Sequence, residues 1–197
     1  VPAGGVEAVA LNVTVTGASE GGFVTVWPSG SGRPGSSSVN FGVGETTANA
    51  VLSGVGPDGS VTIANEFGDV DVLVDVTGWF SSGFVGLVPD RLMDTRAGSG
   101  GFVFGEGEVR DLVVAGRGGV PASGVGAVAL NVTVTQPSVG GFVTVWPAGA
   151  GLPEASNLNF VAGQTTANAV ITGVGSGGAI SLFNAFGDAE LIVDVVG

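Results

Sequence analysis

The sequence of 197 residues contains no cysteine, no histidine and no lysine. Without cysteine the chain forms no disulfide and offers no thiolate to a metal ion. Without histidine or cysteine it has no Ser-His or Cys-His nucleophilic site. Paired carboxylates of the kind that glycosidases use occur only as neighbours on one predicted strand, as at Asp69 and Asp71, where solvated acids are the usual interpretation. We therefore do not expect an enzyme.

Positive charge is scarce. Five arginines stand against 17 acidic residues, which gives a net charge of −12 at pH 7. Phosphate backbones and anionic membrane surfaces bind basic patches, and this composition provides none. A membrane-spanning helix needs about 18 or more consecutive apolar residues, and every such window here contains charge or glycine. These features exclude nucleic acid as a partner and argue against membrane insertion.

The chain is rich instead in glycine, with 38 residues, and in short alternating segments of valine and alanine. Turn residues recur about every 8 to 12 positions, which is typical of short antiparallel strands in a sandwich or barrel. The predicted strands of the first half are 7–16, 23–27, 37–41, 46–55, 60–65 and 69–77. Those of the second half are 125–135, 142–146, 156–160, 165–174, 179–184 and 188–196. The run of β-branched residues in 69–77 predicts burial on both faces.

The most informative feature is an internal repeat. AVALNVTVT occurs at 8–16 and again at 127–135, and GGFVTVWP, TTANAV, FGD and VDV all return at the same offset of 119 residues. A fixed period without gaps is the signature of repeated structural units. The sequence therefore predicts an all-β fold of two tandem antiparallel β-sandwich repeats, of the jelly-roll or immunoglobulin-like kind.

A single unrepeated segment, 79–119, lies between the two copies. It contains an extended stretch at 84–88, the motif RLMDTR at 91–96 and a predicted strand at 108–115. We expect residues 1–80 to form the first repeat, without its opening strands, and residues 81–197 to form the second, including RLMDTR. Because the chain begins with Val1 in place of methionine, we expect a processed protein or a piece of a longer one.

Together these motifs resemble a β-rich tandem repeat of secreted and surface proteins of actinobacteria. Its modules open with an extended stretch leading into R-L-L-D-T-R and close with D-V-x-G-Y-F; here Met93 replaces a leucine and Trp79 replaces the tyrosine. The resemblance covers essentially the whole chain. It implies export to the cell surface, a β-sandwich-like fold and a position in repeat arrays or beside polysaccharide-active domains. It implies no catalytic residue.

Two acidic residues, Asp75 and Asp194, interrupt apolar strands at equivalent positions. A carboxylate in such a strand is costly to bury unless it is paired or hydrogen-bonded. Arg91 and Arg96 are suitable partners, because a guanidinium binds a carboxylate through two hydrogen bonds. We predict a structural ion pair here in preference to an active site.

Two further groups are candidates for binding. Exposed aromatic rows on a sandwich bind sugars by stacking, while the same residues also serve as ordinary cross-strand contacts. Oxygen ligands suit calcium, the one cofactor left open, although the spacing of a calcium-binding loop is absent and a solvated acidic hairpin is the favoured interpretation. The stacking candidates are Phe23, Trp27, Phe142 and Trp146, and the calcium candidates are Asp69, Asp71, Asp188 and Glu190.

One repeat core lacks the segment that the other has, and an unpaired valine-rich strand edge is a template for another chain. We therefore expect a non-catalytic extracellular structural repeat protein that self-associates head to tail, by strand complementation, into a surface fibre or filament. The alternative is a carbohydrate- or cell-wall-binding accessory module of a secreted enzyme, with polysaccharide as its partner.

Overall fold

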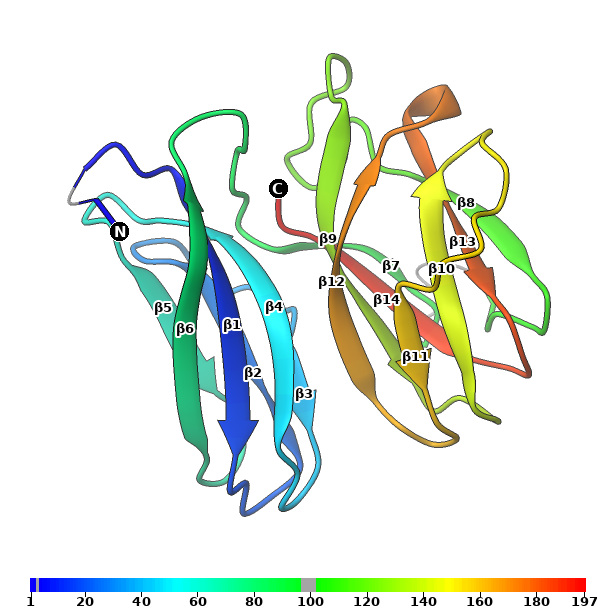
Figure 1. Ribbon diagram of the computed structural model, residues 1–197, viewed down its shortest axis with the longest axis horizontal. Helices are drawn as coiled ribbons and strands as arrows, with labels where there is room; N and C mark the ends of the chain where they lie inside the picture. The colour runs from blue at the N-terminus through cyan, green and yellow to red at the C-terminus, as the bar shows by residue number, and fades with distance from the viewer. Residues whose placement is uncertain (3, 97–101) are drawn as a thin grey trace. The chain divides into compact units, whose positions relative to one another are not determined.

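The computed structural model describes residues 1–2, 4–96 and 102–197 (Figure 1). Within them the chain is built of antiparallel strands with one short 3-10 turn at Ser176–Gly178, which confirms the all-β prediction. The residues form two compact units. Unit 1 comprises Val1–Asp90 with Val196–Gly197, and unit 2 comprises Arg91–Val195. No helix in the described part of the chain is long and apolar enough to cross a membrane.

Unit 1 contains two three-stranded sheets, in the orders β4-β1-β6 and β3-β2-β5. Along β1, Leu11, Val13 and Val15 are buried because the pleat sends every second side chain into the core. Val24 and Val26 of β2 belong to the same buried cluster. The strands are β1 (Ala8–Thr16), β2 (Gly22–Pro28), β3 (Val39–Phe41), β4 (Thr47–Gly54), β5 (Val61–Asn65) and β6 (Asp71–Phe80).

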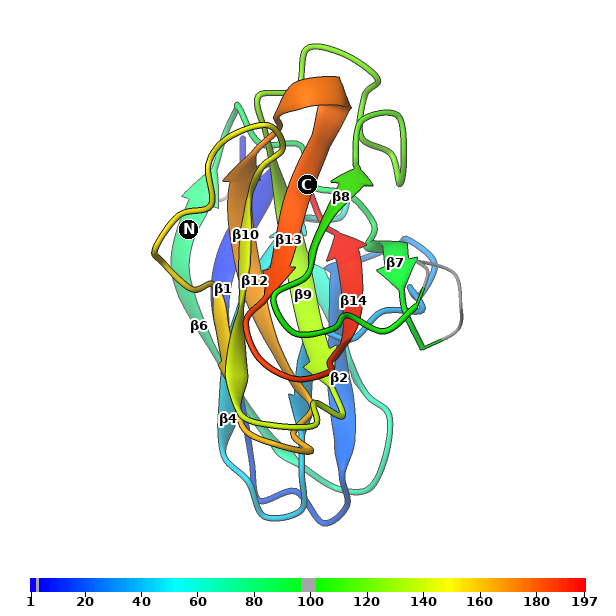
Figure 2. The ribbon, with the colours of Figure 1, turned by 90° about the vertical axis from the view of Figure 1, so that its right-hand side faces the viewer.

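Unit 2 contains two four-stranded sheets, in the orders β12-β9-β14-β7 and β11-β10-β13-β8. Figure 2 shows β7 beside β14 and β8 beside β13. The strands are β7 (Asp90–Asp94), β8 (Val109–Val113), β9 (Ala127–Thr135), β10 (Gly141–Pro147), β11 (Leu158–Phe160), β12 (Thr166–Gly173), β13 (Ala179–Asn184) and β14 (Glu190–Val195).

The first four strands of the two copies coincide at the offset of 119 residues. A shared close approach accompanies them. A side chain at Gly56 would collide with the carbonyl oxygen of Ser29, and one at the equivalent Gly175 would collide with that of Ala148. The same tight turn is therefore needed in both units, and glycine is the residue that permits it. The stretch 84–88, expected to be extended, lies outside any strand.

The units differ at one side. In unit 2, β7 and β8 lie at the edges of β14 and β13, whereas β6 and β5 of unit 1 are themselves edge strands. The prediction that the strand at 69–77 is buried on both faces is therefore wrong for β6. Its side chain at Val74 is 40% exposed, while the equivalent Val193 of β14 is fully buried. The sequence pattern is nearly the same; the neighbouring strand makes the difference.

Candidate functional site

The side of unit 2 that carries β7 and β8 holds a network of charged residues. The Nε of Arg91 donates to Oδ1 of Asp194 over 2.9 Å, and its Nη1 donates to Oδ2 of Asp94 over 2.9 Å. Asp194 is only 1% exposed. A carboxylate this deeply buried is stable only with a charged or hydrogen-bonded partner, and Arg91 provides one from the adjacent strand.

Arg96 binds the second carboxylate of the network and not the first. Its Nε and Nη2 donate to the two oxygens of Asp94 over 3.1 and 2.9 Å, and its backbone N–H also donates to Oδ1. These hydrogen bonds, with the charges of Arg96 and Arg91, lower the pKa of Asp94 against the opposing effect of burial. The same pairing raises the pKa of Arg96.

This shift predicts a pH dependence of stability. A group whose pKa is lower in the folded state stabilises the fold above its unfolded value of about 3.9, and that contribution is lost as pH falls through the folded value. We expect Asp94→Asn to lower the free energy of unfolding of unit 2 by about 1.5–3 kcal/mol at pH 7. The difference in free energy of unfolding between the variant and the parent, here called the gap, should become smaller below about pH 4. Urea unfolding at several pH values measures the gap. A gap that stays constant from pH 7 to pH 3 would contradict the assignment.

Other residues around β7 join it to β14. The N–H of Thr95 donates to the carbonyl of Leu191 over 3.0 Å, and the N–H of Leu191 donates back to the Thr95 hydroxyl over 2.9 Å. From the loop that follows β8, Nη2 of Arg117 donates to the carbonyl of Leu92 over 2.6 Å. β7 is thereby fastened by both backbone and side-chain hydrogen bonds.

Phe104 lies in the connection between β7 and β8 and is completely buried. It exchanges two backbone hydrogen bonds with Ala189, of 3.0 and 2.9 Å. The guanidinium of Arg110 lies 4.1 Å from the centre of its ring, a cation–π arrangement. Arg110 also hydrogen-bonds Glu108 over 2.9 Å, which lowers the pKa of that carboxyl. The ring is thus buried in unit 2, with the guanidinium of Arg110 lying over it.

β8 completes this side. It pairs antiparallel with β13 from Ala179 to Phe183. Beyond it, the N–H groups of Val114 and Ala115 both donate to the carbonyl of Gly178 over 3.0 Å. We call residues 91–116, described at 91–96 and 102–116, the covering segment, because they cover the edges of β13 and β14.

Unit 1 has no counterpart to the covering segment among the residues that the structure describes. Asp75, equivalent to Asp194, is exposed, and no arginine of the described residues pairs with it. The predicted ion pair is therefore present at Asp194, with Arg91 as its partner, and not at Asp75. Apolar side chains stand exposed along both edge strands: Ile63 on β5, and Val72, Leu73, Val74 and Val76 on β6. We call these two edges the open side of unit 1.

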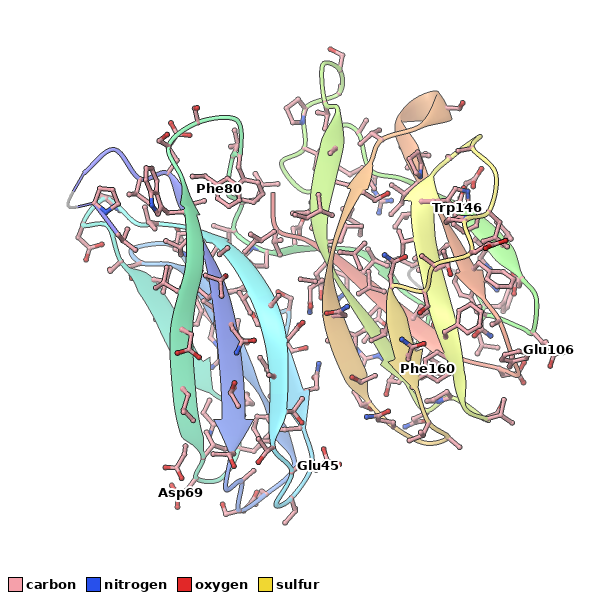
Figure 3. The ribbon with its side chains drawn as sticks, viewed as in Figure 1. Glu45, Asp69, Phe80, Glu106, Trp146 and Phe160 are labelled. Carbon is pink, nitrogen blue, oxygen red and sulfur yellow. The ribbon has the colours of Figure 1, made fainter. Side chains whose placement is uncertain are left out.

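The structure corrects the glycan-stacking hypothesis. Trp27 and Trp146 are buried, and their indole N–H groups donate to the carbonyls of Ser31 and Ala150 in the loops that follow β2 and β10. Figure 3 shows Trp146 beside its loop. Phe23 and Phe142 are half-buried and make edge contacts with Phe67 and Phe186. The two tryptophan rings are therefore not exposed for stacking on a sugar.

The calcium candidates lie at the hairpins that precede β6 and β14, and Figure 3 shows Asp69 at the first of these turns. Within residues 1–2, 4–96 and 102–197, no group of three or more acidic residues is arranged to hold a metal ion. The backbone N–H groups of Asp69 and Asp188 are each bound by a serine hydroxyl, Ser19 and Ser138, over 2.8 Å. These hydrogen bonds tie each turn to the loop that follows β1 or β9.

Sequence reasoning missed two residues that define the site, Phe104 and Asn184. Asn184 is fully buried, and its Nδ2 lies within hydrogen-bonding distance of four carbonyls, among them Phe104 and Gly105 of the covering segment. The equivalent Asn65 is exposed and binds only its own turn, at Phe67 and Gly68. The repeated asparagine was visible in the sequence, but its long-range partners were not.

No protein family model matches the chain, and no curated protein or solved structure matches it. The internal repeat therefore supplies the comparison: unit 2 shows a covered core and unit 1 an uncovered one.

Proposed function

We propose that this chain is a non-catalytic structural repeat protein of the cell exterior, whose molecules join end to end by adding a strand to the open side of unit 1. One observation supports this above all. Two cores of similar sequence lie in one chain, and only in unit 2 do further strands, β7 and β8, cover the strands equivalent to β6 and β5. Exposed backbone edges recruit strands from other chains.

The chemistry of β6 favours pairing over protection. Proteins blunt exposed edges with short strands and frequent charges. The edge strands of unit 2 fit this rule: β7 and β8 have five residues each and carry Arg91, Asp94, Arg110 and Asp111. β6 has ten residues, with Asp71 and Asp75 its two charged side chains. Such a long, valine-rich edge suits an interface between molecules.

The extracellular setting comes from the resemblance to the secreted actinobacterial repeats, and the absence of histidine and cysteine from the sequence supports a non-catalytic role. The alternative, carbohydrate binding, was based on exposed tryptophan rings, and Trp27 and Trp146 are buried.

Sedimentation velocity of the purified chain tests the proposal. We expect concentration-dependent association beyond 19.1 kDa, since a second copy offers its own exposed strand edges. Leu73→Lys with Val76→Lys should abolish it, because charges on an edge oppose pairing. Leu152→Lys, at an exposed loop position of unit 2, is the matched control and should associate like the parent. A parent chain that stays monomeric at all concentrations would contradict end-to-end self-association.

A further inference from the structure

The identity of the strand that fits the open side of unit 1 follows from the repeat. Each residue of the open side as far as Gly78 has an equivalent 119 positions later, and unit 2 shows what contacts that equivalent. Four such pairs of positions, on β5, on β6 and in two turns, carry independent information.

The first pair is electrostatic. Asp75 on β6 is equivalent to Asp194 on β14, and Asp194 is bound by Arg91 of the covering segment at 2.9 Å. Asp75 occupies the same register against β1 that Asp194 occupies against β9, opposite Asn12 and Asn131 respectively. A strand laid along β6 as β7 lies along β14 would bring an arginine to Asp75.

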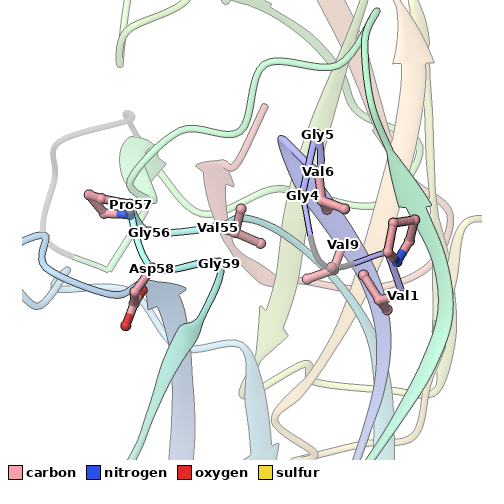
Figure 4. Close-up of a pocket in the computed structure, with 11 residues that line it drawn as sticks. Val1, Gly4, Gly5, Val6, Val9, Val55, Gly56, Pro57, Asp58 and Gly59 are labelled. Carbon is pink, nitrogen blue, oxygen red and sulfur yellow. The ribbon is translucent and has the colours of Figure 1, made fainter.

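The second pair, Gly59 and Gly178, concerns a pocket. A cavity of about 460 Å³ lies in unit 1 between the N-terminal residues and the turn that ends at Gly59, as Figure 4 shows. Gly59 is equivalent to Gly178, whose carbonyl accepts the N–H groups of Val114 and Ala115. Val1 at the pocket is 69% exposed, whereas the equivalent Val120 is 5% exposed. The pocket therefore corresponds to the position that Val114 and Ala115 take in unit 2.

The remaining pairs lie at the opposite end of β5. Val70 is equivalent to Ala189, which exchanges two backbone hydrogen bonds with Phe104. Asn65 is equivalent to Asn184, which also reaches the carbonyls of Phe104 and Gly105. Both positions in unit 1 thus have a backbone or an amide group that a phenylalanine-bearing turn would satisfy.

Residues 1–197 contain two cores and one covering segment, and the described contacts of that segment place it on unit 2. A second copy of the chain also has two cores and one covering segment. Its segment can therefore cover unit 1 of another molecule only by leaving its own unit 2 uncovered. A full complement for unit 1 must come from a further segment of this type.

We propose that the open side of unit 1 is an acceptor site for a segment of the covering type from outside residues 1–197. Its strand bears Arg-x-x-Asp-Thr-Arg, with the first arginine on Asp75. A phenylalanine pairs with the backbone at Val70, and a second, apolar strand pairs with β5 and ends in the pocket beside Gly59. This rests on the proposed function, because it names the partner that completes unit 1 in an end-to-end assembly.

A synthetic peptide of residues 88–116, added to the full chain, tests the site. We expect one peptide to bind per chain in calorimetry, and hydrogen exchange to slow in β5 and β6. Arg91→Ala in the peptide should weaken binding by roughly 30-fold or more, because it leaves the carboxylate of Asp75 at the interface without its guanidinium. Asp75→Ala in the chain should also weaken binding, because the arginine of the peptide then loses one of its two carboxylates. Phe104→Ala in the peptide should also weaken it.

Two controls match these variants. Phe102→Ala in the peptide changes a position that is highly exposed in unit 2, and Asp69→Ala in the chain changes an exposed acid of the same unit. Both should bind like the parent pair. Absence of binding, protection of β13 and β14 in place of β5 and β6, or indifference to Asp75→Ala would each overturn the assignment.

The experiment also separates this inference from the proposed self-association. A chain that stays monomeric yet binds the peptide in the Asp75-dependent manner retains the acceptor site and loses the homopolymer. A chain whose association is abolished by Leu73→Lys with Val76→Lys, but which binds no peptide, overturns the acceptor site while the end-to-end assembly stands.

Discussion

Replacing Arg91 with methionine is expected to lower the free energy of unfolding of unit 2 by about 3–5 kcal/mol, because it removes the cation from a carboxylate inside the protein. Asp194 is 1% exposed, so water cannot replace the guanidinium at 2.9 Å. Methionine keeps much of the volume of the arginine stem, so most of the loss reports on charge and hydrogen bonding. Asp94 also loses one of its two arginines.

A second variant separates the ion pair from packing. Adding Asp194→Leu to Arg91→Met removes the buried charge itself, and buried ion pairs replaced by apolar residues of similar volume are often neutral or stabilising. We expect the double variant to recover most of the loss. Asp75→Leu, at the exposed equivalent position in unit 1, is expected to change stability by no more than about 0.5 kcal/mol.

Hydrogen exchange resolved by segment is the suitable measurement, because β9 and β14 report on unit 2 while β1 and β6 report on unit 1. A double variant as unstable as Arg91→Met alone would show that the loss comes from packing around Arg91 and not from a stranded charge.

The elements of each core were predictable from the sequence because their determinants are local. Alternation along 7–16 and the Gly-Pro-Asp-Gly turn at 56–59 fix a strand and a reversal within a few residues. The gapless offset then transfers each element to the second copy. The short strand at Val39–Phe41 and the ends of β6 were less well placed, since strand ends depend on which neighbour is present to pair.

The environment of Asp75 and Asp194 was not predictable in the same way. Both stand in the letters VDV, and their local patterns are nearly identical. They differ only through the covering segment, about 100 residues away from Asp194 in sequence. Composition and periodicity describe the strand itself, while burial is decided by whichever strand lies beside it. The buried state of Trp27 and Trp146 was missed for a related reason, because the loops that cover them carry no periodic signal.

Replacing Phe104 with alanine is expected to destabilise unit 2 by about 3–5 kcal/mol, the usual cost of emptying a fully buried phenylalanine site. Phe104 is completely buried, and both its backbone N–H and its carbonyl are hydrogen-bonded to Ala189. The surrounding residues therefore have little freedom to move into the cavity that the ring would leave. Loss of the ring also removes the contact with the Arg110 guanidinium at 4.1 Å, worth about 0.5–1 kcal/mol at a partly exposed site.

Phe102→Ala is the matched control, since Phe102 lies two residues earlier with an exposed ring. Its expected effect is within about 0.5 kcal/mol. Urea unfolding followed by the fluorescence of Trp146, in a background where Trp27 and Trp79 are phenylalanine, reports on unit 2 alone. Equal effects from the two phenylalanine variants would show that the connection between β7 and β8 does not close the core. A large effect from Phe104→Ala alone shows that a single ring carries much of the stability that the covering segment gives to unit 2.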